Sequence, residues 1–321
     1  MQDNRTREEM KQVKKLNRSL VSAPLKVQHL LGVMAIQPEK NVFFLGNRVY
    51  VKIYAIKAVS WTDVIVSEFI DMLCCQPQFR FRMTFLCPGE NDTDAGKILR
   101  FLSVYAFCPD FAAADKQFSY LQDSLGSAVE ESGNISVEEC TIDHAMMFIY
   151  MNFTGQLRKF DREKLLGRKG NLPDELCLKD EKARCCFLGK EYPWEINAFK
   201  EKLLNIGCAL QICIDIQGLD GDDRRLLDYI VGQKYHTDVG ETMGGTEIVN
   251  LTYMLVLTGA EKSDVYKASE DVKVSARKNH MLLSYDSGMQ ERIYMSMCTF
   301  GLRDFHAMRN VSKDVIKNLV I

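Results

Sequence analysis

Histidine and cysteine are the side chains best suited to bind a metal ion or to attack a carbonyl group, and the chain has five and eleven of them. No two histidines are four residues apart, the spacing that brings two imidazoles to one metal ion on a helix. There is no C-x-x-C motif and no G-x-S-x-G motif. These patterns argue against a zinc site and against acyl transfer. The histidines are His29, His144, His236, His280 and His306.

The eleven cysteines are an odd number, and two pairs, Cys74–Cys75 and Cys185–Cys186, are adjacent in sequence. Cytosolic cysteine behaves as a small hydrophobic residue. We therefore expect reduced and mostly buried thiols.

Two further clusters resemble sites that bind phosphate or metal. The segment Gly240–Glu247 has the glycine spacing of a phosphate-binding loop, but Thr246 stands where that loop has its lysine. Asp220, Asp222 and Asp223 lie at the start of an expected helix, where carboxylates cap the backbone and meet the helix dipole. The sequence thus predicts no catalytic, cofactor-binding or metal-binding residue and no enzymatic activity in this chain.

Composition places the chain among globular proteins. Hydrophobic residues make up 46% and charged residues 26% of it, with only 20 glycines and 7 prolines. The net charge of −2 provides no overall positive field for a phosphate backbone, so direct binding of nucleic acid is not expected.

No apolar run reaches the roughly 20 residues that a membrane-spanning helix needs. The longest is Ala145–Met151, and the first 20 residues contain no apolar core of a secretory signal. We expect a cytoplasmic protein.

The segment from Thr6 to Val21 has the pattern of a basic amphipathic helix. The first 20 residues of the chain carry a net charge of +3, and no aromatic side chain is present there to stack on bases. Docking on an acidic partner or an anionic membrane surface is favoured over a nucleic-acid arm, and a solvated tail is the alternative. The predicted docking residues are the apolar stripe Met10, Val13, Leu16 and Leu20 with Lys14 and Lys15.

The first half of the chain shows alternating strand and helix patterns. A hairpin is predicted over 41–56, with Gly46-Asn47 as a type II′ turn. A helix over 61–75, a strand over 78–87 and a helix over 111–131 follow. The apolar run 142–153 is predicted to be a buried strand. The segment 158–193 has no sustained period and indicates an irregular connection.

The second half continues the alternation. A helix is predicted from Pro193 to Gly207, followed by a strand over 208–217 whose polar Gln211, Asp215 and Gln217 indicate one solvated face. The remaining predicted elements are a helix over 222–231, a strand over 247–258, a helix over 263–278, a strand over 281–285 and a helix over 289–298.

This order predicts an α+β fold with mixed or antiparallel sheets and helices packed on them, in a two-layer ferredoxin-like arrangement. The expected organisation is a basic helix and linker over 1–38, a first α+β subdomain over 39–166, an irregular connection over 167–192 and a second α+β subdomain over 193–321.

The last eighty residues resemble the end of the N-terminal domain of conjugative type IV secretion ATPases of the TraC/TraE class. The order of elements carries the resemblance: an apolar strand, a charged helix, a short strand, a helix led by glutamine, and a turn with glycine. Here these are Tyr253–Thr258, Ser263–Lys278, Met281–Tyr285, Gln290 with its helix, and Phe300-Gly301, followed by Arg309 and Ser312. The segments 27–56, 203–215 and 226–236 are similar to the opening hairpin and the middle of that domain. The family's Leu-Pro before the turn is missing, and no Walker segment precedes Ile321.

The resemblance implies a structural and interaction domain that lacks the ATPase motor and docks onto inner-membrane or scaffold proteins of a conjugation machine. A peripheral contact with the inner face of the membrane and assembly with copies of itself stay open. The alternative is an α+β domain that binds a ligand or catalyses a reaction at a site built from residues distant in sequence.

We predict that the chain does not bind ATP with micromolar affinity, because Gly240–Thr246 lacks the lysine that reaches the β- and γ-phosphates. Calorimetric titration with ATP and Mg²⁺ should give no heat of binding. A saturable micromolar isotherm would contradict this prediction.

Overall fold

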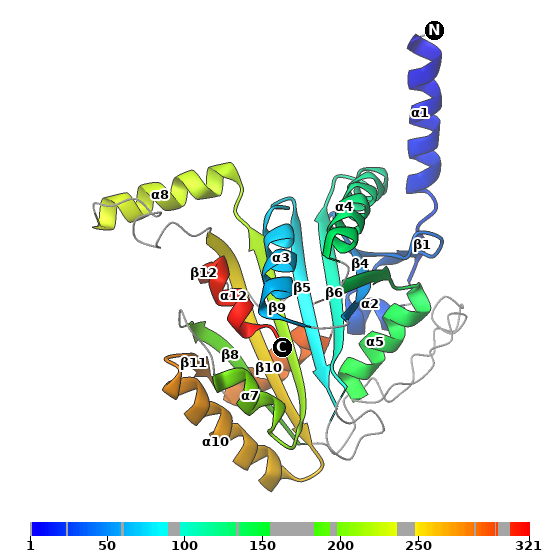
Figure 1. Cartoon of the computed structure of the whole chain (residues 1–321). Coiled ribbons are helices and arrows are strands. Elements are labelled where there is room, and N and C mark those ends of the chain that lie inside the picture. The colour runs from blue at the N-terminus through cyan, green and yellow to red at the C-terminus, as the bar shows by residue number, and fades with distance from the viewer. Residues whose placement is uncertain are drawn as a thin grey trace.

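The computed structural model describes residues 2–23, 25–58, 61–88, 97–132, 135–154, 183–192, 198–235, 248–285, 287–298, 300 and 309–321. Within these residues the strands form one continuous antiparallel sheet, with helices packed on both of its faces (Figure 1). The strands are β1 Val21–Ser22, β2 Ala35–Gln37, β3 Val42–Gly46, β4 Val49–Ala58, β5 Phe79–Cys87, β6 Leu99–Phe107, β7 Ile135–Glu139, β8 Ala183–Glu191, β9 Ala209–Gly218, β10 Ile248–Gly259, β11 Leu282–Ser284 and β12 Arg309–Ser312. The helices are α1 Gln2–Asn17, α2 Leu25–Leu31, α3 Asp63–Cys74, α4 Phe111–Ser132, α5 Ile142–Thr154, α7 Ala198–Leu204, α8 Gly221–Tyr235, α10 Lys262–Lys278, α11 Gln290–Cys298 and α12 Lys313–Leu319, with a 3₁₀ turn at Ser287–Met289 before α11.

The sheet contains the same topology twice. The first copy is β4-α3-β5-β6-α4-β7 and the second is β8-α7-β9-β10-α10-β11, and each continues into one more helix, α5 or α11. In both copies the strands are ordered fourth, first, third, second across the sheet, which is the ferredoxin-like order. The predicted α+β class, with helices packed on an antiparallel sheet, is confirmed. We call these copies the first repeat (49–154) and the second repeat (183–298).

The two repeats join through the outer strands β5 and β9. These strands pair antiparallel from Arg80 opposite Gln217 to Cys87 opposite Leu210. Each strand would otherwise present a row of unpaired backbone groups at a sheet edge. Their pairing makes one sheet out of two.

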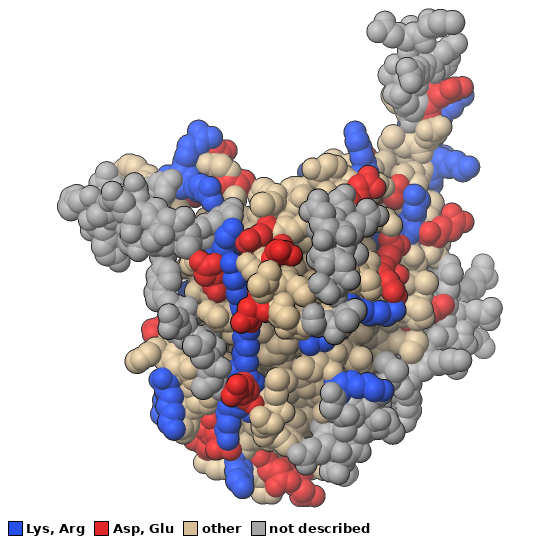
Figure 2. Space-filling view, viewed as in Figure 1, with Lys and Arg blue, Asp and Glu red and all other residues tan. Residues whose placement is uncertain are grey.

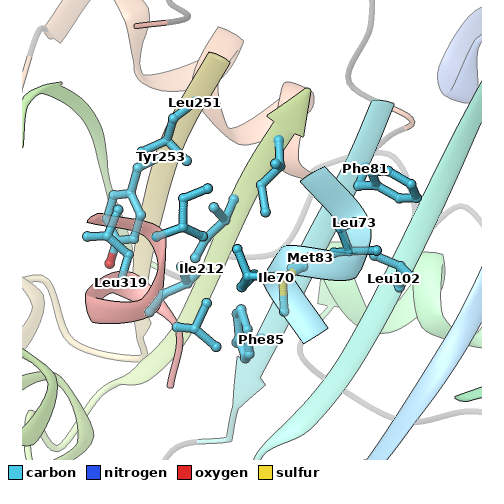
Figure 3. Close-up of a cluster of buried hydrophobic side chains, with 14 of the residues drawn as sticks. Ile70, Leu73, Phe81, Met83, Phe85, Leu102, Ile212, Leu251, Tyr253 and Leu319 are labelled. Carbon is cyan, nitrogen blue, oxygen red and sulfur yellow. The ribbon is translucent and has the colours of Figure 1, made fainter. Parts of the chain in front are cut away.

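One face of the sheet carries the larger hydrophobic core, under α3, α4, α7, α10 and α12. Ile70 and Leu73 of α3 lie over Phe81, Met83 and Phe85 of β5, next to Ile212 of β9, and Leu319 of α12 lies beside Tyr253 of β10 (Figure 3). Side chains of both repeats therefore share this core. The opposite face carries a second core under α2, α5 and α11, so the helices extend beyond the predicted two layers.

The prediction of a buried strand over 142–153 is wrong, because these residues form the helix α5. Its buried residues Ile142, Ala145, Met146 and Ile149 follow the helical spacing i, i+3, i+4, i+7. Thr141 caps the helix, since its hydroxyl accepts the N–H of His144 at 3.3 Å. The high apolar content of this segment arises because α5 is buried against the second core.

The irregular connection predicted over 167–192 is wrong for Ala183–Glu191, which forms β8 between β10 and β11. This strand is buried on both faces and therefore lacks the alternation of a half-exposed strand. Residues 167–182 lie outside the described residues. The expected linker before residue 39 contributes β1, α2 and β2 to the fold.

The hairpin of β3 and β4 is present, but its turn differs from the predicted type II′ at Gly46-Asn47. Gly46 pairs with Val49, so the two turn residues are Asn47 and Arg48. Both have positive φ, +48° and +64°, which is the type I′ pattern. Gly46, at φ +82°, lies in the bulge before the turn.

Gly218 at the end of β9 provides a test of how closely the two repeats approach. A Cβ atom there would lie 2.5 Å from the Cys74 carbonyl oxygen of α3. We expect Gly218→Ala to lower the free energy of unfolding by about 1–3 kcal/mol, as overpacking does. The measurement is urea unfolding followed by circular dichroism.

Gly126→Ala is the matched control for this substitution. A Cβ at Gly126, inside α4, meets nothing within 4 Å. This variant should gain about 0.5–1 kcal/mol from helix propensity. Equal effects of the two substitutions would contradict the close approach at Gly218.

Candidate functional site

The N-terminal helix α1 extends away from the body of the molecule and contacts it at its C-terminal end (Figure 1). Leu16 and Leu20 are partly buried against the larger core. The Asn17 side-chain oxygen accepts the N–H of Ala112, at the start of α4, over 3.0 Å. These three residues attach the helix to the first repeat.

The predicted docking stripe is thereby divided between two roles. Leu16 and Leu20 pack on the chain itself, whereas Met10 and Val13 are 56% and 40% exposed. Lys14 and Lys15 are also exposed, and Figure 2 shows basic side chains on this projecting part of the molecule. Four of the six predicted docking residues are therefore accessible to a partner.

Sequence reasoning missed three apolar side chains that follow α1. They are Val21 in β1, Leu25 at the start of α2 and Met34 before β2, with exposed fractions of 44%, 71% and 38%. We use the name N-terminal surface for the accessible residues of this part of the chain. It comprises Met10, Val13, Lys14, Lys15, Val21, Leu25 and Met34.

A buried charge cluster lies where the two repeats meet, on the face of the second core. Arg82 of β5 and Asp215 of β9 are direct cross-strand partners. The Arg82 Nε and Nη2 atoms donate to the two carboxylate oxygens of Asp215 over 2.5 and 2.8 Å, and Arg80 Nη2 donates to Oδ2 over 3.2 Å. Arg82 Nη1 also donates to the Ser296 carbonyl oxygen of α11 over 2.6 Å. The cluster thus connects both repeats and the covering helix.

These contacts correct the prediction of a solvated face on the strand 208–217. The Asp215 and Arg82 side chains are only 4% and 3% exposed. Burial alone would raise the pKa of the Asp215 carboxyl, but the adjacent Arg82 and Arg80 outweigh it and hold this pKa below its usual value. Burial alone would lower the pKa of Arg82, but the attraction of the Asp215 carboxylate outweighs this effect and raises the pKa above its usual value. Both groups are therefore ionised at neutral pH.

The arginines at positions 80 and 82 alternate with Phe79 and Phe81, which in sequence looks like an ordinary strand with one polar face. The signal that could have found the cluster is the presence of two arginines on one strand and one aspartate on another, each among strongly apolar residues. The hydrophobic pattern of the sequence does not show which strands pair or in which register, so it does not place Arg82 opposite Asp215.

The other candidate groups have structural roles where they are described. Asp220 caps α8, because its Oδ1 accepts the N–H groups of Asp222 and Asp223 over 2.9 and 2.8 Å. Among the residues that the structure describes, no group of three or more His, Cys, Asp or Glu side chains is placed to hold a metal ion. The glycine-rich segment Gly240–Glu247 lies outside them.

Most described cysteines are buried, as expected. Burial raises the pKa of Cys185 to about 11 and that of Cys186 to about 12. These thiols are protonated at neutral pH and are poor nucleophiles. They serve as core residues of β8.

Comparison with known proteins identifies no family. No family model and no curated protein matches the chain. Two solved structures are similar at low level. A variant of berberine bridge enzyme in complex with (S)-reticuline is 14% identical over 80% of this chain and 51% of its own, with a TM-score of 0.33. A mutant of chlorite dismutase from Candidatus Nitrospira defluvii is 10% identical over 78% of this chain and 96% of its own, with a TM-score of 0.18.

The chain thus spans about half the length of berberine bridge enzyme. Among the described helices, none combines the length and the apolar character that crossing a bilayer requires.

Removing the carboxylate of the buried charge cluster should destabilise the fold strongly. Asp215→Asn leaves two buried guanidinium groups without a counter-charge, so we expect a loss of about 3–5 kcal/mol in the free energy of unfolding at pH 7. Because the pKa of Asp215 is lowered in the folded state, its stabilising contribution is full at neutral pH and falls as the pH drops below about 4. Urea unfolding of both proteins at several pH values measures this difference.

Asp222→Asn is the control, because Asp222 forms an ion pair with Arg225 that is almost fully exposed. It should leave the stability essentially unchanged. A small effect of Asp215→Asn, or an effect that persists undiminished at low pH, would show that the cluster does not stabilise the junction.

Proposed function

We propose that the chain is a structural and interaction domain of a conjugative type IV secretion machine. In this role it docks through its N-terminal surface onto inner-membrane or scaffold proteins, on the cytoplasmic side. The observation that carries the proposal is α1, a basic helix that projects from the fold with accessible apolar and lysine side chains.

A helix of this length is marginal in water when it is not packed. The contacts that attach it to the described body come from its C-terminal end, through Leu16 and Asn17, and from Leu20 just after it. The exposed side chains of Met10 and Val13 would contribute apolar burial if a partner covered them. Lys14 and Lys15 suit an acidic protein face or anionic lipid headgroups, and that attraction weakens with salt.

The resemblance of the last eighty residues to the TraC/TraE class is the reason why the proposed assembly is a conjugative type IV secretion machine. Several elements behind that resemblance are present in the expected order as β10, α10, β11 and α11. We propose the TraC/TraE class, and not another family with the same order of elements, on the basis of this resemblance.

An α+β domain that binds a ligand is the second candidate. It is favoured by the excess of positive charge in the buried charge cluster, where two arginines face one aspartate.

DNA transfer from donor cells tests the proposed function. We expect the variant Met10→Ser, Val13→Ser, Lys14→Glu, Lys15→Glu to lower transfer about tenfold or more, since a loss of about 1.4 kcal/mol in docking already changes binding tenfold. Its melting temperature should stay unchanged because all four side chains are exposed.

The control places comparable changes on α10, as Lys262→Glu, Lys267→Glu and Val274→Ser, where the side chains are also exposed. This variant should transfer DNA at the normal frequency. Normal transfer by the α1 variant at normal protein level, or equal losses in both variants, would contradict docking through the N-terminal surface.

A further inference from the structure

The buried charge cluster is not electrically balanced. Its groups are the guanidinium groups of Arg80 and Arg82 and the single carboxylate of Asp215, with side chains 8%, 3% and 4% exposed. The carboxylate is already held by Arg82 through two hydrogen bonds and by Arg80 through one. A net positive charge is therefore enclosed at the junction, which is costly unless a counter-charge is present.

Two polar atoms near this charge have no hydrogen-bond partner among the described residues. They are Arg80 Nε and the hydroxyl oxygen Thr252 Oγ1. Thr252 is fully buried on β10, directly opposite Asp215 of β9 in the strand register. Register also places Arg80 on the same face of the sheet, diagonal to Asp215. Buried polar atoms in native folds are nearly always hydrogen-bonded, so each of these two atoms requires a partner that the described residues do not supply.

The chemistry of these atoms defines what would satisfy them. A guanidinium N–H is only a donor, and a hydroxyl group donates as readily as it accepts. Two donors beside an excess positive charge fit a ligand that accepts hydrogen bonds and carries negative charge. A cation would meet the guanidinium groups unfavourably.

We infer that the junction of the two repeats binds a small oxyanion of the phosphate class, held by Arg80 and Thr252 next to the Arg82–Asp215 pair. Planar guanidinium groups are well matched to such oxygens. Because the Arg80 side chain is only 8% exposed, the inferred oxyanion is a small free ion such as inorganic phosphate rather than the phosphate of ATP. The ion would neutralise the excess charge and stabilise the contact between the repeats.

The test is the melting temperature of the full chain in inorganic phosphate against chloride, at matched pH and ionic strength. The wild type should melt higher in phosphate, with a saturable dependence on its concentration. Arg80→Met removes the excess charge, so this variant should fold and lose the phosphate dependence. Titration with ATP in place of phosphate should give no shift.

Thr252→Val keeps the side-chain shape and removes only the hydroxyl group. It should weaken the apparent phosphate affinity about tenfold, the effect of losing about 1.4 kcal/mol of interaction. Lys267→Met, which removes an exposed charge on α10, should leave the phosphate dependence intact. If Arg80→Met does not fold, the comparison of Thr252→Val with Lys267→Met still decides the question.

Absence of a phosphate effect in the wild type would overturn the inference, and would leave water as the partner of the two donors. A phosphate effect of the same size in Arg80→Met or in Thr252→Val would overturn it as well, because the ion would then bind elsewhere. The docking proposal is unaffected by either result, since it depends on a different surface.

Discussion

The pairing of β5 with β9 is the contact on which the rest of the structure depends. A ferredoxin-like repeat has an outer strand whose backbone groups are unpaired, and here the two outer strands pair with each other. Arg82 and Asp215 sit opposite each other within this pairing. A shift of the register by one residue would move one of the two charges to the opposite, apolar face of the sheet. The buried ion pair therefore specifies the register as well as contributing to stability.

The same pairing explains why helices cover both faces. In each repeat, α3 and α4 or α7 and α10 cover the first face, as in a two-layer fold. The second face carries the buried charge cluster at the junction, and α11 closes over it through the bond from Arg82 to the Ser296 carbonyl. The last helices of the two repeats also meet, because Tyr294 and Cys298 of α11 donate to the Asn152 carbonyl of α5. The extra layer thus spans the junction and shields the charges from bulk solvent.

Much of the fold could be predicted from the sequence, and the errors have physical causes. Amphipathic helices such as α4 and α10 were predictable because half of their surface is exposed. The sequence does not identify α5 as a helix, because further apolar residues fill the positions between its helically spaced buried ones. It does not identify the strand β8, because that strand is buried on both faces and lacks alternation. The accessible side chains of α1 were predicted, but the anchoring role of Leu16 and Leu20 was not, because it depends on the position of α4. The sequence does not reveal the buried charge cluster, since Asp215 is more than 130 residues away from both arginines.

The central claim is that the two repeats form one cooperative unit through β5 and β9. Native-state hydrogen exchange measures it most directly, by giving the free energy of opening for individual backbone amides. The amides of Phe81–Phe85 and Ile212–Ile216 should exchange most slowly and with the same free energy, which equals that of global unfolding. If the amides of one repeat open at a clearly lower free energy while those of the other stay protected, the repeats unfold separately, and the junction does not hold the structure together.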